Sequence, residues 1–211
     1  WTFTPDADFN GGVTLSYTVG DGTGSAANAG TITVTAVNDA PVAVADSVAA
    51  SEDTALTILA SALLAKDSDV DGDALSLTAV GNAVNGTAAL DVNGDVVFTP
   101  GADFNGAASF DYTVSDGNGA SDTGTVTVNV TAVNDAPDTV ADSAAASEDT
   151  ALTILASALL ANDSDVDGDT LSISSVSNPV NGSVLLDGSG DVVFTPAADF
   201  NGAATFDYTV S

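Results

Sequence analysis

The sequence predicts an all-β protein made of tandem β-sandwich repeats. Of its 30 acidic residues, Glu52 and Glu148 are the only glutamates, so nearly all the acid is aspartate. Aspartate favours turns, whereas glutamate favours helices. Runs such as residues 110–114 alternate apolar and polar side chains, as half-buried strands do. Several strings recur 96 residues apart, which indicates tandem domains.

The repeats define the domain organisation. The string DSDVDGD begins at Asp67 and Asp163, and VNDAP recurs with the same spacing. With VNDAP as the joint, residues 1–38 are the C-terminal part of a first repeat, 39–134 a complete repeat, and 135–211 a third repeat without its last strand. About seven strand-like runs per repeat, separated by Asn-Gly and Asp-Gly turns, predict a sandwich of immunoglobulin type. The string TILASALLA breaks the alternation and predicts a short helical turn.

The composition excludes most classes of active site. The net charge is −29, Lys66 is the only basic residue, and Cys and His are absent. Thiol and imidazole catalysis, cysteine or histidine metal sites and nucleic-acid binding are therefore excluded. Hydrophobic residues make up 45%, enough for a folded core. No apolar run is long enough for a transmembrane helix, and no signal peptide precedes the first strand pattern.

The clustered aspartates of DSDVDGD favour bound cations. Each copy places four carboxylates in seven residues, namely Asp67, Asp69, Asp71 and Asp73, then Asp163, Asp165, Asp167 and Asp169. Alternate carboxylates in a tight turn converge, and calcium takes six to eight oxygen ligands. The EF-hand pattern fails, because its twelfth position is Thr78 where a glutamate is required. The alternative is solvated turn aspartates, but repulsion between four like charges argues against an empty site.

These motifs together resemble those of a known family. The VNDAP joint, the SED string, the D-x-D of DSDVDGD and the YTVSDG string are similar to the calcium motifs of cadherin-like repeats. The nearest branch is the bacterial tandem repeats, about 95 residues long, of giant secreted RTX-type surface adhesins. The resemblance covers the whole chain. It implies cadherin-like sandwiches arranged as an elongated rod, with one or more Ca²⁺ ions at each joint, on the bacterial cell surface.

The resemblance also implies ligands at each joint. For the first joint they are Asp8, Asn38, Asp39, Asp69, Asp71 and Asp116. For the second they are Glu52, Asp103, Asn134, Asp135, Asp165 and Asp167. Glu148 would serve a further joint, and Asp67, Asp73, Asp163 and Asp169 would supplement the sets. Alanines stand at positions 36, 40, 132 and 136, where the cadherin repeats of animals have acidic or amide side chains. This difference implies fewer ions per joint than in the animal repeats.

The recurring DFNG string allows two interpretations. Its phenylalanines, Phe9, Phe104 and Phe200, are expected in the core, and Asn-Gly is a turn signal. Asp8, Asp103 and Asp199 are then either turn residues or calcium ligands.

The leading functional prediction is a calcium-stiffened structural extender of a long extracellular bacterial adhesin or surface filament, in cell adhesion or biofilm formation. Its partners would be neighbouring repeats, without nucleic acid or membrane insertion. One alternative is a glycan- or self-binding module. Another is a head-to-tail fibre in which strand 30–37 of one copy completes the third repeat of the next; more simply, the sequence covers only part of that repeat. An enzyme is not expected, because a catalytic site is not normally repeated in every domain.

Overall fold

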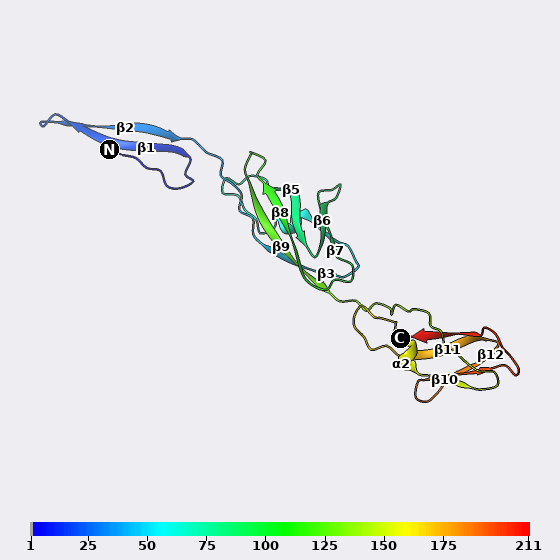
Figure 1. Cartoon of the computed structure of the whole chain (residues 1–211). Helices are drawn as coiled ribbons and strands as arrows, with labels where there is room; N and C mark the ends of the chain where they lie inside the picture. The colour runs from blue at the N-terminus through cyan, green and yellow to red at the C-terminus, as the bar shows by residue number, and fades with distance from the viewer. Residues whose placement is uncertain (1) are drawn as a thin grey trace. The chain divides into compact units, whose positions relative to one another are not determined.

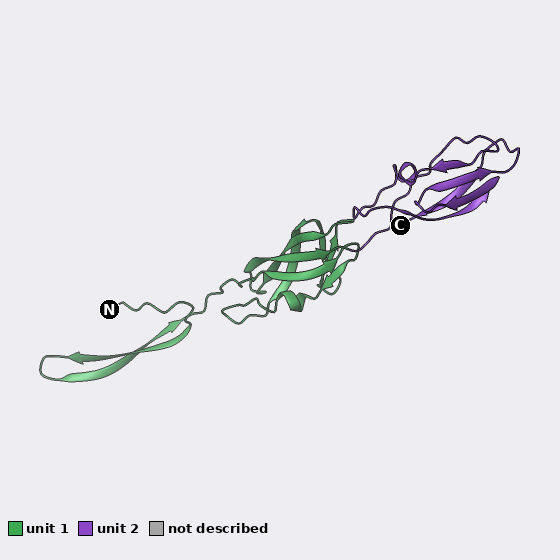
Figure 2. Ribbon diagram, turned by 90° about the horizontal axis from the view of Figure 1, so that it is seen from below, with its two compact units in different colours: residues 1–132 green, residues 133–211 purple. Residues whose placement is uncertain are grey.

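The computed structural model describes residues 2–211, so Trp1, the only candidate tryptophan for a glycan site, lies outside the described residues. The chain forms two compact units, residues 1–132 and 133–211 (Figure 2). Strands dominate both, which confirms the all-β prediction. Neither of the two short helices described is long and apolar enough to cross a membrane.

The first segment is a β-hairpin. Strands β1 (Gly11–Gly20) and β2 (Ser25–Val34) pair antiparallel along their whole length (Figure 1). Asp21 closes the turn, because its Oδ1 accepts the backbone N–H groups of Thr23 and Gly24. The apolar face of the hairpin stays largely exposed, at 43% for Leu15 and 48% for Tyr17. Phe9, which DFNG places in a core, is 41% exposed, so that expectation is wrong for this copy.

The complete repeat is a seven-stranded sandwich. One sheet has the order β3-β9-β8-β5 and the other β4-β7-β6. Strand β3 pairs with β9 in parallel, and the other pairs are antiparallel. The predicted helical turn is present as α1 (Ala60–Leu63). The strand bounds are β3 (Asp46–Ser51), β4 (Leu56–Ile58), β5 (Ser76–Val84), β6 (Gly86–Leu90), β7 (Val96–Pro100), β8 (Gly106–Ser115) and β9 (Ser121–Thr131).

Alternating side chains of β8 and β9 form the core of the complete repeat. Phe110 and Tyr112 of β8 and Val126 and Val128 of β9 are fully buried. Phe98, from the other sheet, stacks on Phe110 with ring centroids 5.8 Å apart. The core thus joins both sheets, as a sandwich requires. The DFNG residue Phe104 packs against this core, as the sequence predicts.

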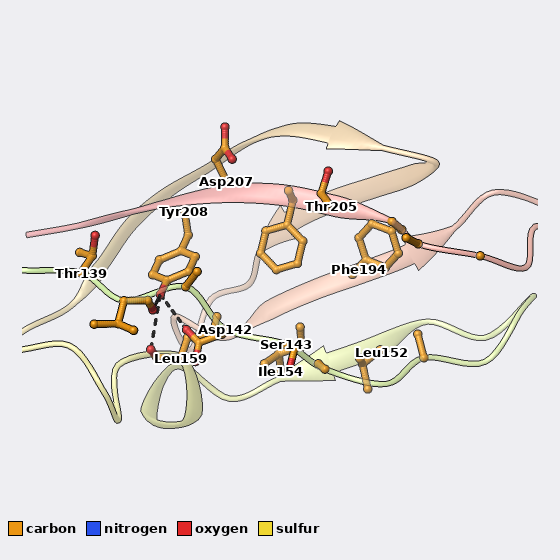
Figure 3. Close-up of a pocket in the computed structure, with 18 residues that line it drawn as sticks. Thr139, Asp142, Ser143, Leu152, Ile154, Leu159, Phe194, Thr205, Asp207 and Tyr208 are labelled. Carbon is orange, nitrogen blue, oxygen red and sulfur yellow. Dashed lines mark hydrogen bonds between the residues drawn. The ribbon is translucent and has the colours of Figure 1, made fainter.

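The third repeat repeats part of this sandwich. Its sheets have the orders β10-β13-β12 and β11-β14, and α2 (Ala156–Leu159) repeats the helical turn. Its strands are β10 (Leu152–Ile154), β11 (Ile173–Val180), β12 (Gly182–Leu186), β13 (Val192–Pro196) and β14 (Thr205–Val210). Residues 142–147, which correspond to β3, form no strand. A cavity of about 870 Å³ opens beside them (Figure 3).

Gly124 lets β9 approach the ring of Tyr112. A Cβ atom at this position would lie 2.5 Å from the ring, closer than any real contact allows. We therefore expect Gly124→Ala to lower the free energy of unfolding by about 1–3 kcal/mol, through strain in a packed core. Urea denaturation measures this, with Gly81→Ala in β5 as the control, because a Cβ at Gly81 meets nothing within 4 Å. If both variants lost the same unfolding free energy, the close packing of Gly124 against Tyr112 would be contradicted.

Asp122 fixes the segment that precedes β3. Its Oδ2 accepts the backbone N–H of Ala43 at 2.9 Å, and this bond, with a second from the Thr123 N–H, holds the pKa of Asp122 below its usual value. A carboxyl with a lowered pKa in the folded state stabilises the fold above its unfolded pKa of about 3.9. This stabilisation of the folded state is lost as the pH falls through the lowered pKa of Asp122.

The pH dependence of Asp122→Asn tests this contribution. The asparagine still offers an oxygen to Ala43 but has no charge to lose. We expect the wild type to be more stable than the variant by a constant margin between pH 7 and 5, measured in chelator. The margin should shrink below about pH 4; a margin that grows on acidification would refute the assignment.

Candidate metal centres

A group of acidic residues gathers at the start of the complete repeat. Single carboxylate oxygens of Asp69, Asp73 and Asp116 all lie within 4.8 Å of one another. Asp69 and Asp73 belong to the loop between α1 and β5, and Asp116 directly follows β8. The topology brings these loops together, because β5 begins where its antiparallel neighbour β8 ends, with Ser76 opposite Ser115.

The loop folds around Asp69. Its Oδ1 accepts the backbone N–H groups of Asp71 at 2.9 Å and Asp73 at 3.3 Å. Gly72 permits the curl, since its φ of +79° is one that residues with a side chain rarely adopt. The other oxygen, Oδ2, is buried and has no hydrogen-bond partner among the described residues. A buried acceptor without a donor is costly, so this oxygen suits a cation.

Asp116 is the most enclosed member of the group, at 4% exposed. Its Oδ1 accepts the N–H groups of Asn118, Gly119 and Ala120, and its Oδ2 accepts the side-chain amide of Asn38 at 2.6 Å. These hydrogen bonds, the one from Asn38 foremost, hold the pKa of Asp116 below its usual value. The carboxylate therefore stays charged at neutral pH, as a metal ligand must.

Two further contacts connect the linker and the turn to this group. The backbone N–H of Asp39 donates to Asp71 Oδ2 at 2.8 Å, so the predicted linker pair Asn38–Asp39 lies beside the predicted loop. Asn118 donates its side-chain amide to Asp73 Oδ2 at 2.7 Å. Asn118 is not among the predicted ligands, although its place in the acidic turn SDGNG, two residues after Asp116, is a usable signal.

Asp67 has a different set of partners. It accepts the backbone N–H of Val44 at 2.7 Å and the hydroxyl of Tyr112 at 3.1 Å. Burial, then the charge of Asp67, raises the pKa of Tyr112 above its usual value. Nearby, Lys66 Nζ forms an ion pair with the buried Asp46 at 2.5 Å. Asp67, the first aspartate of DSDVDGD, thus stabilises the sandwich through these hydrogen bonds. Lys66, the only basic side chain, is already paired with Asp46.

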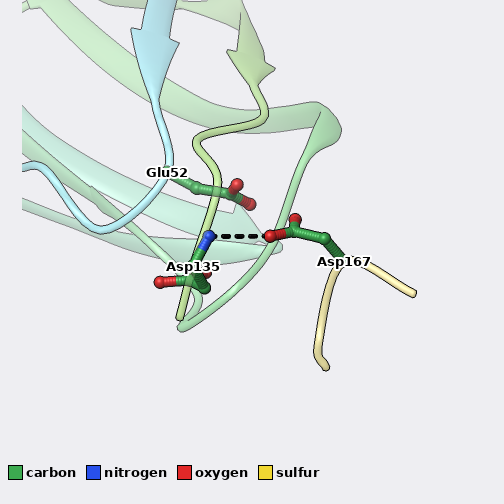
Figure 4. Close-up of side chains that lie close together, drawn as sticks. All are labelled: Glu52, Asp135 and Asp167. Carbon is green, nitrogen blue, oxygen red and sulfur yellow. Dashed lines mark hydrogen bonds between the residues drawn. The ribbon is translucent and has the colours of Figure 1, made fainter. Parts of the chain in front are cut away.

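The third repeat has the same local arrangement. Asp135 donates its backbone N–H to Asp167 Oδ2 at 2.7 Å (Figure 4). Asp165 Oδ1 accepts the N–H groups of Asp167 and Asp169, at 3.0 and 3.2 Å. The side-chain amide of Asn134 donates to the carbonyl of Asp135. Asp163 takes the place of Asp67, because it accepts the N–H of Val140 at 2.8 Å.

A second group of acidic residues lies at the opposite end of the complete repeat. Glu52 directly follows β3, is 1% exposed, and donates its backbone N–H to Thr131 at the end of β9. Asp103 donates its backbone N–H to Asp53 Oδ1 at 3.2 Å. Asp53 is not among the predicted ligands, although it is the neighbour of Glu52 in the SEDT string.

Three other predicted positions are less enclosed. Asp103 has a φ of 53° and Asp8 a φ of 60°, the left-handed conformation of turn aspartates, and Asp8 is exposed. Glu148 is exposed as well. In the third repeat, Asp199 donates its N–H to Asp149 at 3.0 Å, which repeats the pair of Asp103 and Asp53.

The ligand chemistry of the gathered residues is uniform. Every group that the described loops bring together offers carboxylate, amide or carbonyl oxygen. Hard cations such as Ca²⁺ and Mg²⁺ prefer such donors, and softer metals prefer nitrogen or sulfur. The residues at the start of the complete repeat therefore fit a hard divalent cation such as calcium.

Comparison with known proteins identifies the family. The cadherin-like domain model matches three segments of the chain, residues 1–35, 37–131 and 133–211. The chain therefore belongs to the cadherin-like domain family. No curated protein matches it.

Similar solved structures include cadherin ectodomains. "PcdhgB3 EC1-4 in 50 mM HEPES" is 14% identical with a TM-score of 0.43, over 94% of this chain and 56% of that one. The human desmocollin-1 ectodomain is 14% identical with a TM-score of 0.35, over 94% and 46%. The endo-fucoidan hydrolase MfFcnA4, of glycoside hydrolase family 107, is 20% identical with a TM-score of 0.36. The match covers 99% of this chain but only 33% of the hydrolase.

Proposed function

We propose that this chain is a calcium-stiffened structural extender of a long extracellular adhesin or surface filament, without enzymatic activity. The observation that carries the proposal is the convergence of Asp69, Asp73 and Asp116 beside the linker residues Asn38 and Asp39. Membership of the cadherin-like family supports an extracellular adhesion-type module. The bacterial surface setting is supported by the resemblance of the repeats to bacterial adhesins.

The charges of this group favour a divalent cation. Three carboxylates within 4.8 Å repel one another strongly in a partly dehydrated site. Lys66, the only basic side chain, is paired with Asp46 and does not offset this repulsion. Calcium accepts six to eight oxygens in flexible geometry, whereas Mg²⁺ demands a near-ideal octahedron and keeps several waters. A set built from several irregular loop and linker residues suits the variable coordination of calcium better.

We extend the proposal to the second linker. Its ligands would be Glu52, Asp53 and Asp103 from the end of the complete repeat, Asn134 and Asp135 from the linker, and Asp165, Asp167 and Asp169 from the third repeat. Chain connectivity supports this grouping, because only residues 132–134 separate the end of β9 from Asp135. The hydrogen bond from Asp135 to Asp167 has a direct counterpart in the bond from Asp39 to Asp71.

The proposed mechanism is electrostatic. Without calcium, the carboxylates repel and single hydrogen bonds hold each linker to the repeat that follows it. With calcium, linker and loop carboxylates share an ion, which restricts the angle between successive repeats. Extracellular modules bind calcium with dissociation constants of about 10⁻⁴–10⁻³ M, too weak for cytosolic calcium. Stiffening would therefore occur only outside the cell.

The glycan-binding alternative lacks an aromatic platform in the described sandwiches. Carbohydrate sites use exposed aromatic side chains, but Tyr112 is fully buried. Tyr208 donates its hydroxyl to Asp142 at 2.8 Å from within the third repeat. In the hairpin segment, Tyr17 is 48% and Phe9 41% exposed. Their counterparts in the complete repeat, Tyr112 and Phe104, belong to or pack against the core, so the exposure of Tyr17 and Phe9 does not by itself indicate a glycan site.

Charge removal at Asp69 tests the proposed ligand set. Asp69→Asn keeps an oxygen for the two loop N–H groups but removes a carboxylate from the cluster, so we expect calcium affinity to fall at least tenfold in isothermal titration calorimetry. Asp91→Asn is the matched control, because Asp91 accepts the N–H groups of Asn93 and Asp95 in the same type of turn. Equal affinities in the two variants would exclude Asp69 as a ligand.

Chelation tests the stiffening. Removal of calcium should lower the melting temperature, because an ion at ten times its dissociation constant contributes about 1.4 kcal/mol to stability. X-ray scattering of the same samples should show a wider range of shapes in chelator than in millimolar calcium. Magnesium at equal concentration is the control for ionic strength. Identical melting and scattering with and without calcium would rule the mechanism out.

A further inference from the structure

Asn118 forms hydrogen bonds with two of the three clustered carboxylates. Its backbone N–H donates to Asp116 Oδ1 at 2.8 Å, and its side-chain amide donates to Asp73 Oδ2 at 2.7 Å. Asp116 directly follows β8, whereas Asp73 lies in the loop between α1 and β5. A single residue thus connects the two loops that supply the carboxylate group.

Asp73 is the member of the group that the protein holds least. Asp69 Oδ1 accepts two backbone N–H groups, and Asp116 accepts three of them and the amide of Asn38. Among residues 2–211, which the structure describes, only Asn118 donates a hydrogen bond to the side chain of Asp73. Without this bond, repulsion from the other two carboxylates would turn Asp73 towards solvent.

The bond also leaves part of Asp73 free to bind an ion. The amide of Asn118 donates to Oδ2, so the other carboxylate oxygen, Oδ1, is not used by this contact. Carboxylates that bind metals are commonly oriented in this way by a hydrogen bond from a residue outside the ligand set. Such a residue affects metal affinity without contacting the ion.

The fold of the turn does not depend on the amide of Asn118. The turn between β1 and β2 reads DGTG where the turn after β8 reads DGNG, so Thr23 takes the place of Asn118. The backbone N–H of Thr23 donates to Asp21 Oδ1 at 2.9 Å, and its hydroxyl donates to the same oxygen. Asn118→Thr is therefore a substitution that this type of turn accepts.

Asn93 shows what an asparagine does in a turn of the same kind outside the group. Its backbone N–H and its side-chain amide both donate to Asp91, at 2.7 and 3.2 Å, within a single turn. Asn93 and Asn118 are both exposed, and each precedes a glycine. They differ in that the side chain of Asn118 extends to a second loop.

We infer that Asn118 is a positioning residue for calcium: it holds Asp73 in the ligand set without itself binding the ion. The inference rests on the proposed calcium function. It makes the fourth aspartate of DSDVDGD a ligand through the turn that follows β8, so the turn sets the affinity of the site together with the loop. Partners of this kind typically contribute a factor of about 10–100 to metal affinity.

Calcium titrations of the full chain, followed by ¹⁵N NMR, test this role. The backbone N–H signals of Gly72 and Gly119 report this site, because both glycines lie in the loops that carry the carboxylate group. We expect Asn118→Thr to weaken calcium binding at this site by at least about tenfold. Asn93→Thr is the matched control and should bind as the wild type does.

A double-mutant cycle separates positioning from a general loss of structure. Asp73→Ala keeps the backbone N–H that Asp69 Oδ1 accepts, but it removes the carboxylate that Asn118 holds. In that background, we expect Asn118→Thr to change calcium affinity by less than about twofold, because its effect passes through Asp73. Equal losses in the two backgrounds, or wild-type affinity in Asn118→Thr alone, would overturn the inference.

The hydrogen bond is tested without calcium as well. In chelator, the side-chain amide signal of Asn118 should shift in Asp73→Ala, while that of Asn93 should not. An Asn118 signal that is insensitive to this change would overturn the inference even if calcium binds. If the Gly72 and Gly119 signals of the wild type do not respond to millimolar calcium, the proposed function fails as well, so the two failures are distinguishable.

Discussion

Mutual repulsion between carboxylates at the start of the complete repeat is the constraint that its loops and the preceding linker must offset. In the complete repeat, Asp69, Asp73 and Asp116 gather within 4.8 Å although the chain already carries a net charge of −29. Backbone N–H groups and the Asn38 amide stabilise these charges only in part, since Asp69 Oδ2 is buried without a partner among the described residues. A bound cation would complete the arrangement.

Hydrogen bonds within the loops hold the acids close together. Asp69 and Asp165 each accept two N–H groups of their own loop, and Asp71 and Asp167 each accept one from the linker aspartate. The same hydrogen bonds are thus present in both the complete repeat and the third repeat. The linker is therefore positioned by local folding, and calcium would strengthen a geometry that the loops already favour.

Much of the fold could be predicted from the sequence, because strand alternation and turn residues act locally. The seven strands, the helical turn and the apolar face of β8 all follow from residues 39–134. The separate role of Asp67 could not be predicted, because its partners Val44 and Tyr112 are distant in sequence. The position of Asn118 in the acidic turn after Asp116 was visible in the sequence, but its contact with Asp73 was not, because it crosses between two loops. The exposure of Phe9 depends on which strands surround it, not on the DFNG string.

The most direct measurement is anomalous X-ray diffraction from crystals of the chain grown in millimolar calcium. The proposed function predicts a calcium peak bound by Asp69, Asp73 and Asp116. Diffraction that resolves these side chains and shows only water among them would contradict the central claim.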